Sequence, residues 1–362
     1  MIKLISPENG AVLSAMTPGQ KKFVRLFNGG ELDGALFPPD GKGAYDWLPP
    51  KRGAGRDLAA PPFVVFRWES DAAATAMFFE ISTDPDFRVP APVSVLGIRE
   101  DGEREDSYFA VVTNLQGGAR YFWRISDGEK KSESFSFTTE RGAVRFVWVE
   151  GLSDVRDLGG KPTEDGRYIK EGMIFRGPAL DAIIDPPYEM SERGKKALVS
   201  EIGIKTEIDL REEAREIIRR CVLSDDIEYD LIPLESYVRV FLDYNEVSFR
   251  QIFNILADES KYPVYFHCQI GSDRTGTLAM FVLAALRASD RAIDFDYSVN
   301  SMTITEKRSF TGNPEVREFL SELDARYPGG SYADKMRRHL IKAGVKPETI
   351  EKVREIITEE KK

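Results

Sequence analysis

The chain has 362 residues and a formal net charge of −10, from 50 Lys and Arg against 60 Asp and Glu. Hydrophobic residues make up 42% of it and aromatic residues 11%, which is enough apolar material for packed cores and excludes a wholly disordered chain. The excess of acidic residues argues against a nucleic-acid binder that neutralises many phosphates. The chain has only two Cys and two His. Two Cys cannot form a disulfide scaffold, and these four residues would make a poor structural zinc site.

The N-terminus and the apolar runs predict no membrane-spanning segment. Pro7 and Glu8 follow the first residues before an apolar stretch can form, so we expect no signal peptide. The longest apolar run, from Leu278 to Leu286, is far shorter than the ~20 residues that span a bilayer. The expected location is therefore the cytoplasm at face value, whereas a leader removed ahead of Met1 would imply export.

The first 144 residues predict an irregular arm followed by an all-β domain. Residues 18–62 are dense in Gly and Pro, with Pro-Pro pairs at 38–39, 49–50 and 61–62, which is typical of an extended or irregular segment that packs on the next domain. Between residues 61 and 140, runs such as PPFVVFRWES and SESFSFTTE alternate apolar and polar residues and are bounded by Gly, Asp, Asn or Pro. This alternation predicts a small β-sandwich.

One segment of this sandwich resembles a known family. The stretch LQGGARYFWR, from Leu115 to Arg124, is similar to the tyrosine-corner region of fibronectin type III domains. The resemblance implies a fibronectin type III-like domain over residues 61–140. Its aromatic residues, including Tyr121 and Trp123, are expected in the core, and a groove that binds a protein or a carbohydrate is the alternative.

From residue 145 to residue 362 the pattern predicts a second domain of α/β class, with a central sheet flanked by helices. Residues 1–145 hold 18 basic and 20 acidic residues, which leaves 32 and 40 for the rest, so the second domain carries most of the negative charge. Short apolar runs predict strands at 145–149, 173–175, 205–210, 228–233 and 263–268. Apolar residues at helical spacing predict helices at 191–202, 212–221, 246–258, 275–288, 314–326, 332–343 and 347–358.

The run PVYFHCQIGSDRTGT, which starts at Pro263, carries the chemistry. An apolar strand leads into the loop CQIGSDR, which opens an apolar helix. Backbone N–H groups at such a helix N-terminus converge on an anion, and the helix dipole adds to them. Cys268 at the start of the loop would therefore be held as a thiolate, and Arg274 at its end can grip two phosphate oxygens. This combination predicts phosphoryl transfer to sulfur and then hydrolysis.

Three segments resemble one enzyme family. The motif HCxxGxxRTG is similar to the phosphate loop of cysteine-dependent protein tyrosine phosphatases, and VRDLGG at 155–160 and KTEIDLR at 205–211 resemble signatures of the bacterial atypical tyrosine and dual-specificity phosphatases. The resemblance implies an α/β cysteine-phosphatase fold that needs no cofactor and no metal, and a phosphorylated protein or small phosphate monoester as its partner. The fixed positions of the motif are His267, Cys268, Gly271, Arg274, Thr275 and Gly276.

The resemblance also implies a role for each loop residue. Cys268 matches the nucleophile, and Arg274 matches the phosphate clamp. Thr275 matches the hydroxyl that stabilises the leaving thiolate, and His267 matches the imidazole that orders the loop. The backbone amides expected to cradle the phosphate are those of Gln269, Ile270, Gly271, Ser272, Asp273 and Arg274.

The general acid is less well marked in the sequence. The leaving oxygen needs a proton from a neutral carboxyl group within hydrogen-bond reach. Asp273, just before the clamp arginine, is the acid that the resemblance favours. Asp209, Asp243 and Asp230 are the alternatives.

Two departures from the family pattern bear on the substrate. Ser272 stands where the group usually has Lys, and this loss of a cation argues against polyanionic phosphoinositides. Asp154 stands where the group usually has Asn, with no clear consequence. We therefore expect phosphotyrosine, with phosphoserine and phosphothreonine as further substrates. The alternatives are a phosphoinositide phosphatase, a non-catalytic binder of phosphorylated ligands and, more weakly, a sulfur transferase, against which the RTG and RDLGG segments argue.

The remaining candidates have simpler interpretations. Cys221 lies at helical spacing from two isoleucines, so core packing is expected. His339 is expected at the surface or at a helix end. Arg156 and Asp157 are expected to brace the fold by an ion pair, and Arg211 is expected at a helix N-terminus with a solvated acidic face.

Overall fold

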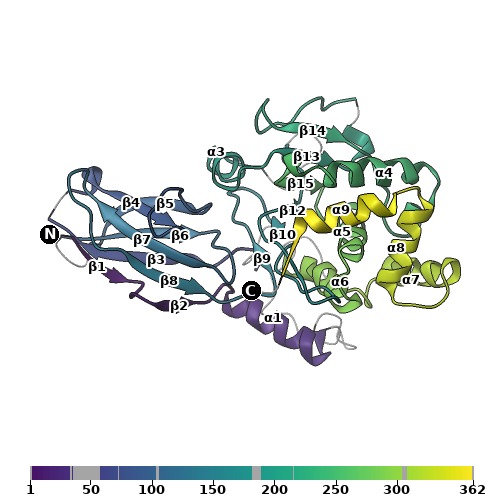
Figure 1. The fold of residues 1–362 in the computed structure, drawn as a ribbon, viewed down its shortest axis with the longest axis horizontal. Coiled ribbons are helices and arrows are strands. Elements are labelled where there is room, and N and C mark those ends of the chain that lie inside the picture. Colours follow the sequence, from purple (N-terminus) through teal and green to yellow (C-terminus); the bar gives the residue numbers. More distant parts are fainter. Residues whose placement is uncertain are drawn as a thin grey trace. The chain divides into compact units, whose positions relative to one another are not determined.

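The structure is a computed structural model that describes residues 2–32, 35, 58–71, 73–102, 106–181, 189–214, 216–303 and 308–360. The chain forms two compact units, of which one comprises Met1–Thr17 and Pro61–Arg145 and the other comprises Pro18–Ala60 and Phe146–Lys362 (Figure 1). Over the described ranges, no helix is long and apolar enough to cross a membrane.

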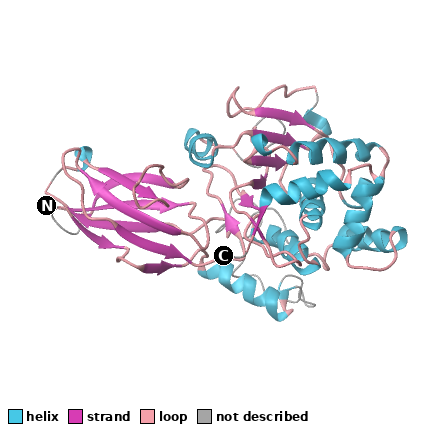
Figure 2. Ribbon diagram, viewed as in Figure 1, coloured by secondary structure: helices cyan, strands magenta, loops and turns pink. Residues whose placement is uncertain are grey.

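The first unit consists of two four-stranded sheets, drawn in magenta in Figure 2. Strand β2 pairs with β8 in parallel, and the other pairings in these sheets are antiparallel. A short 3-10 helix, Ala74–Ala76, precedes β4. One sheet has the order β1 (Lys3–Ser6), β3 (Val64–Glu69), β6 (Ser107–Thr113) and β5 (Ser94–Glu100), and the other has the order β2 (Ala11–Leu13), β8 (Phe135–Thr139), β7 (Arg120–Ser126) and β4 (Phe78–Ser82).

Aromatic side chains from both sheets form the core of this unit. The ring of Phe66 on β3 lies 5.1 Å from that of Trp123 and 5.5 Å from that of Phe137, both on the other sheet. The buried Tyr121 hydroxyl accepts a hydrogen bond from the backbone N–H of Gln116 at 2.8 Å, as a tyrosine-corner hydroxyl does. The resemblance to fibronectin type III domains remains a prediction.

The predicted irregular arm contains a helix, α1 (Pro18–Gly29), which belongs to the second unit. Phe23 and Phe27 are one helical turn apart, and both rings pack on Phe295, at centroid distances of 6.3 and 5.0 Å. Phe295 lies on α6 (Asp290–Ser298), so an apolar stripe fixes α1 there. Most of the Gly- and Pro-rich stretch that follows lies outside the described residues.

A six-stranded sheet forms the centre of the second unit. Its order is β14 (Glu228–Leu231), β13 (Thr206–Asp209), β15 (Val264–His267), β12 (Ile174–Gly177), β10 (Arg156–Asp157) and β9 (Arg145–Phe146). The four strands from β14 to β12 are parallel, and β10 is antiparallel to β12. The short strands β11 (Tyr168–Ile169) and β16 (Thr358–Glu359) pair separately.

Helices cover both faces of this sheet, as Figure 1 shows. On one face Ile208, Val264 and Phe266 share a core with most of the long helices. On the other face Phe175 and Tyr265 share a core with Leu198, which lies on the π-helical turn Ala197–Ile202 that continues α3 (Glu192–Lys196). The helices of the first face are α4 (Tyr244–Leu256), α5 (Asp273–Ala285), α7 (Pro314–Arg326), α8 (Tyr332–Lys342) and α9 (Pro347–Ile357).

In the second unit the predicted elements occur in the predicted order, but one predicted helix is shorter, and helix α6 and the short strands β10, β11 and β16 were not predicted. The helix predicted at 212–221 is only a 3-10 turn, Glu212–Ala214, in the described residues, and Ile217 beyond it is 53% exposed. The charged run supplies too few buried residues to hold a long helix on the sheet. Helix α6 was missed because its sequence, DRAIDFDYS, is short and rich in Asp.

Candidate active site

The predicted loop lies at the carboxyl end of the parallel strands. Strand β15 is buried along its length, and the loop Cys268–Ser272 joins it to α5, which starts at Asp273. His267 lies in register with Gly177 on β12 and with Asp209 on β13, so the ends of three strands meet below the loop. The N-terminus of α5 thus points at the loop, which is the arrangement expected for an anion site.

The loop turns at Gly271, which a larger residue could not replace without movement. Its φ is +78°, and an added Cβ would lie 2.6 Å from the carbonyl carbon of Gly177. Its own carbonyl accepts a hydrogen bond from Nη2 of the buried Arg176 at 2.8 Å. The neighbouring strand β12 therefore both limits and holds the turn.

Arg176 belongs to a buried charge cluster behind the loop. It donates through Nη1 to Asp296 at 2.7 Å, and Lys161 lies 3.4 Å from the same carboxylate. Burial alone would raise the pKa of Asp296, but Lys161, Arg156 and Arg176 hold it at about 2. The cluster therefore keeps its charges paired in the absence of water.

The RDLGG segment supports this cluster and does not reach the loop. Arg156 is buried and pairs with Asp154 and Asp296, so it braces the fold as predicted, although with different partners. Asp157 instead accepts hydrogen bonds from the backbone N–H groups of Gly159 and Gly172, at 2.8 and 2.6 Å. Asp154 has a φ of +62°, a conformation that Asn and Asp tolerate, so the change from the family's Asn keeps the backbone geometry.

Cys268 is a free, buried thiol at the first position of the loop. Burial alone would raise its pKa, but the charge of Arg274 and hydrogen bonding from Thr275 hold the pKa below its ordinary value. The Thr275 hydroxyl is itself buried and has no hydrogen-bond partner in the described part of the chain, so it is available to the sulfur. The site therefore favours the thiolate, which is the nucleophilic form.

His267 orders the loop from the end of β15. Its Nε2 lies 2.8 Å from Oε1 of Glu207, and its Nδ1 lies 3.2 Å from the carbonyl oxygen of Cys268. Both partners can accept a hydrogen bond, so a protonated imidazole, which donates from both ring nitrogens, fits them best. Burial alone would lower the pKa of His267, but Asp209 and Glu207 raise it above its ordinary value. A buried cation thus lies next to the nucleophile.

Arg274 is held by a carboxylate that the sequence did not single out. Its Nη1 and Nη2 donate to Oε2 and Oε1 of Glu213, at 2.8 and 2.7 Å. A guanidinium has five N–H donors, and Glu213 uses one on Nη1 and one on Nη2. The N–H groups on the edge that contains Nε can therefore still donate to two phosphate oxygens. Glu213 therefore fixes the direction of Arg274 without using the edge that a phosphate needs.

Asp273 is in contact with a tyrosine and an arginine. Its Oδ1 accepts a hydrogen bond from the Tyr237 hydroxyl at 2.6 Å and lies 2.6 Å from Nη1 of Arg308. The Tyr237 hydroxyl also lies 2.7 Å from that of Tyr297. An ion pair uses the carboxylate form, so Asp273 would have to take up a proton before it could act as an acid.

Comparison with known proteins identifies the family. A model of the tyrosine phosphatase family matches residues 147–360. The chain belongs to the tyrosine phosphatase family. A tyrosine-protein phosphatase from Nostoc commune is 26% identical over 161 residues, which cover 36% of this chain and 54% of that protein, so the chain spans about half the length of this curated relative. Among solved structures, one that is similar is the core catalytic domain of the PP-IP phosphatase SIW14 from S. cerevisiae in complex with citrate. Its sequence is 16% identical, and the match covers 51% of this chain and 96% of that chain, with a TM-score of 0.30.

The other three candidates for the general acid have different surroundings from those of Asp273. Asp209 accepts hydrogen bonds from Arg211 and from the Tyr229 hydroxyl, and although burial alone would raise its pKa, His267 and Arg211 hold the pKa below its ordinary value. Asp243 is exposed at the start of α4. Asp230 lies on the edge strand β14, where burial and Glu228 raise its pKa.

Arg211 is buried just before the 3-10 turn Glu212–Ala214, whereas the prediction placed it at the start of a longer helix with a solvated acidic face. It donates to Asp209, to Oδ2 of Asp181 at 2.6 Å and to the side-chain oxygen of the loop residue Gln269 at 3.0 Å. The segment after β13 is not a long helix, so Arg211 turns back over the ends of the strands. Arg211 thereby links β13 to the phosphate loop.

Three further residues of this phosphatase-family unit can be compared with their predictions. Cys221 packs in the core as predicted, and burial raises the pKa of its thiol to about 12. His339 lies in the last turn of α8, which is the helix-end alternative of its prediction, and not at the surface. It packs against Phe281, its Nδ1 lies 2.9 Å from the Tyr327 hydroxyl, and burial lowers its pKa to about 4. Ser272 is buried, and its hydroxyl has no hydrogen-bond partner in the part of the chain that the structure describes.

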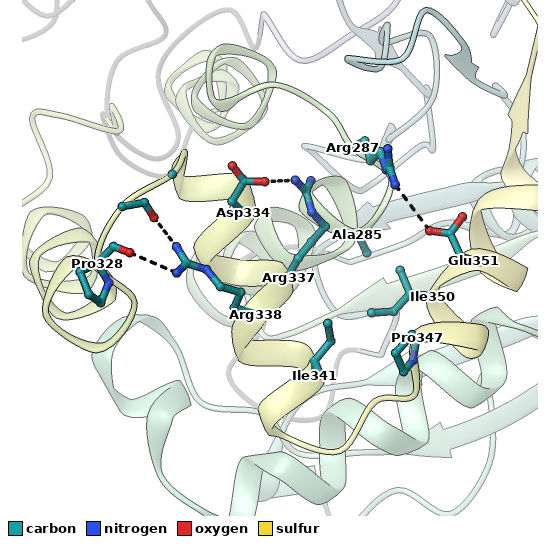
Figure 3. A pocket seen from close by; sticks show the side chains of 12 residues that line it. Ala285, Arg287, Pro328, Asp334, Arg337, Arg338, Ile341, Pro347, Ile350 and Glu351 are labelled. Atoms are coloured by element: carbon teal, nitrogen blue, oxygen red, sulfur yellow. Dashed lines mark hydrogen bonds and ion pairs between the residues drawn. The ribbon is translucent and has the colours of Figure 1, made fainter.

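Described residues of this unit line two pockets that can be compared with the phosphate loop. One, of about 900 Å³, is lined by Arg274 and Glu213 and therefore adjoins the phosphate loop. The other, of about 610 Å³, lies between the end of α5, α8 and α9 and includes no loop residue (Figure 3). Its arginines have partners, since Arg337 donates to the carbonyl of Ala284 and Arg338 to that of Pro328. We therefore place the candidate substrate site at the first pocket.

The structure does not test the predicted absence of a metal. In the ranges that are described, no group of three or more His, Cys, Asp or Glu side chains is arranged to hold a metal ion. The groups at the loop are a thiol, a guanidinium, a hydroxyl and a carboxyl. These can supply a nucleophile, an anion clamp and a proton donor.

Proposed function

We propose that this protein is a phosphatase that hydrolyses phosphotyrosine, and further phosphate monoesters, through a cysteinyl-phosphate intermediate and without a metal. The observation that carries the proposal is the buried, free Cys268, whose pKa is lowered at the N-terminus of α5 beside Arg274. A thiolate and an oriented guanidinium at one phosphate-sized loop are the two groups that this chemistry needs. Membership of the tyrosine phosphatase family supports the same reaction.

The proposed reaction has two steps. In the first, the Cys268 sulfur forms a bond to phosphorus, the bond to the leaving oxygen breaks, and an acid gives that oxygen a proton. In the second, a water attacks phosphorus, loses its proton to the same carboxylate, and releases the thiolate. Arg274 stabilises the negative charge on the oxygens of the phosphoryl group during both steps. The Thr275 hydroxyl donates a hydrogen bond to the sulfur when it leaves as a thiolate.

Asp273 is the proposed acid of the first step. It is the first residue of α5, next to Arg274 in sequence, and its side chain is 33% exposed, so a substrate can reach it. Its contacts with Arg308 and with the Tyr237 hydroxyl hold the side chain in place at the start of α5. Glu213 is a second carboxyl at the clamp and is included in the test below.

The alternatives are supported less well. A phosphoinositide phosphatase would profit from extra cations beside the loop, whereas Ser272 is neutral and buried. A non-catalytic binder would not need the lowered pKa of Cys268 or the Thr275 hydroxyl. A role of the first unit in binding a protein or a carbohydrate remains a prediction.

The direct experiment is hydrolysis of an aryl phosphate in the presence of EDTA. The proposal expects turnover by the unmodified protein and none by Cys268→Ser. No turnover by the unmodified protein, or full turnover by Cys268→Ser, would contradict it. A panel of phosphopeptides and phosphoinositides then separates the substrate classes, and preference for a multiply phosphorylated inositide would overturn the assignment to phosphotyrosine.

A further inference from the structure

The pocket beside Arg274 has an unusual charge for a site that receives a phosphate. Its lining comes from the segment after β13, the segment after β14, α4 and the first turn of α5. Three carboxylates line it, those of Glu212, Glu213 and Glu235, and Arg274 is the single cation among its described lining residues. The phosphate clamp therefore opens into an acidic groove.

The formal charge of the described lining residues is negative, because three carboxylates and one guanidinium are among them. Glu213 neutralises Arg274 through two hydrogen bonds, so the clamp adds little net positive charge to its surroundings. Glu235 accepts from Arg239 at 2.8 Å, but the Arg239 side chain is 65% exposed and does not line the groove. Charges that face solvent are screened, whereas charges that face a bound peptide act through a medium of lower dielectric.

One wall of the groove is apolar and exposed. Tyr244 and Val247, three residues apart on α4, are 56% and 48% exposed, and Leu234 and Pro233 also line the groove. Such a wall can contact an aromatic ring or an aliphatic stem. The carboxylates at its rim can accept hydrogen bonds from an ammonium or a guanidinium.

We propose that this groove binds the residues beside a phosphotyrosine and selects substrates with Lys or Arg next to it. The inference rests on the proposed function and adds the substrate class. The stems of such side chains pack on the wall formed by Tyr244 and Val247, and their charged ends pair with Glu212 and Glu235. Acidic neighbours, and ligands with several phosphates, meet the same carboxylates and are rejected.

The test uses one phosphotyrosine peptide with Lys, Ala or Glu on both sides of the phosphotyrosine. At low ionic strength we expect kcat/KM for the Lys peptide to exceed that for the Glu peptide by about tenfold, and the ratio to fall to about twofold near 0.5 M salt. Glu212→Gln combined with Glu235→Gln should bring the low-salt ratio to about twofold. The matched control, Glu318→Gln with Glu355→Gln, removes the same charge from exposed positions on α7 and α9 and should leave the ratio unchanged.

Equal values for the Lys and Glu peptides, a preference for the Glu peptide, or a ratio that the double variant leaves unchanged would overturn the inference. Binding of the same peptides to Cys268→Ser, measured by calorimetry, gives the order of affinities without turnover. A protein that binds the Lys peptide best but hydrolyses nothing would contradict the proposed function and support the groove. A protein that hydrolyses all three peptides equally would support the proposed function and contradict the selection of substrates by the groove.

Discussion

Arg274 and Glu213 meet through two hydrogen bonds, with Nη1 2.8 Å from Oε2 and Nη2 2.7 Å from Oε1. The two residues come from different elements, α5 and the turn after β13, so the clamp is positioned by the tertiary fold. Hydrogen bonding from Arg274 lowers the pKa of Glu213, which keeps the pair charged. The direction in which Arg274 faces the phosphate therefore depends on Glu213.

Glu213→Ala should lower kcat/KM for an aryl phosphate by about 10- to 100-fold, because Arg274 loses its fixed orientation. Glu213→Gln keeps one hydrogen bond and should lose less. The loss should appear in kcat more than in KM, since an oriented clamp acts mainly on the transition state. Equal kinetics of all three proteins would show that Glu213 does not position the clamp.

Gly271→Ala should destabilise the protein and disable the loop. The methyl group would approach the backbone of Gly177, and Ala would have to adopt a φ of +78°. Gly203→Ala is the matched control, because Gly203 has a φ of +75° but open space around it. We expect losses in the free energy of unfolding of about 1 kcal/mol for Gly203→Ala and about 2–4 kcal/mol for Gly271→Ala, measured by urea unfolding. Equal losses would argue against the close approach of β12 to the loop.

The protonated His267 should make stability depend on pH. Its pKa is raised in the folded state, so its contribution is fully present below the unfolded value of 6.5 and is lost as pH rises through the folded value. Cys268, with a lowered pKa, acts in the opposite direction, so the comparison is best made in Cys268→Ser. In that background, adding His267→Gln should remove the fall in the free energy of unfolding above pH 6.5. The same fall in both proteins would place the titration elsewhere.

The choice of acid can be tested with a substrate that has a poor leaving group. Asp273→Asn should lower kcat on an alkyl phosphate by about 100-fold and have a smaller effect on an activated aryl phosphate, because only the alkoxide needs the proton. Asp209→Asn, Asp243→Asn and Glu213→Gln are the comparisons. If Asp273→Asn keeps the original rate on the alkyl phosphate and one of these variants loses much more on the alkyl than on the aryl phosphate, that residue is the acid.

Local patterns in the sequence predicted the strand, loop and helix around Cys268, because an apolar strand, a Gly-containing loop and an apolar helix are contiguous. They predicted α7 at 314–326, which begins with Pro and has regular apolar spacing. Glu213 and Arg308 could not be found in this way, since each meets its partner, Arg274 or Asp273, only through the fold. The burial of Arg211 and His339 could not be predicted, because a polar residue in a charged run is usually exposed, whereas here both are buried with partners.

The central claim is that Cys268 forms a covalent bond to phosphorus. The most direct measurement is acid quenching of the protein during turnover of an aryl phosphate, followed by mass spectrometry of the peptide that contains Cys268. We predict a phosphoryl group on Cys268, absent from Cys268→Ser and accumulating more in Thr275→Ala, because the departing thiolate loses its hydrogen-bond donor. Turnover without any phosphorylated Cys268, or a phosphoryl group on another residue, would contradict the account.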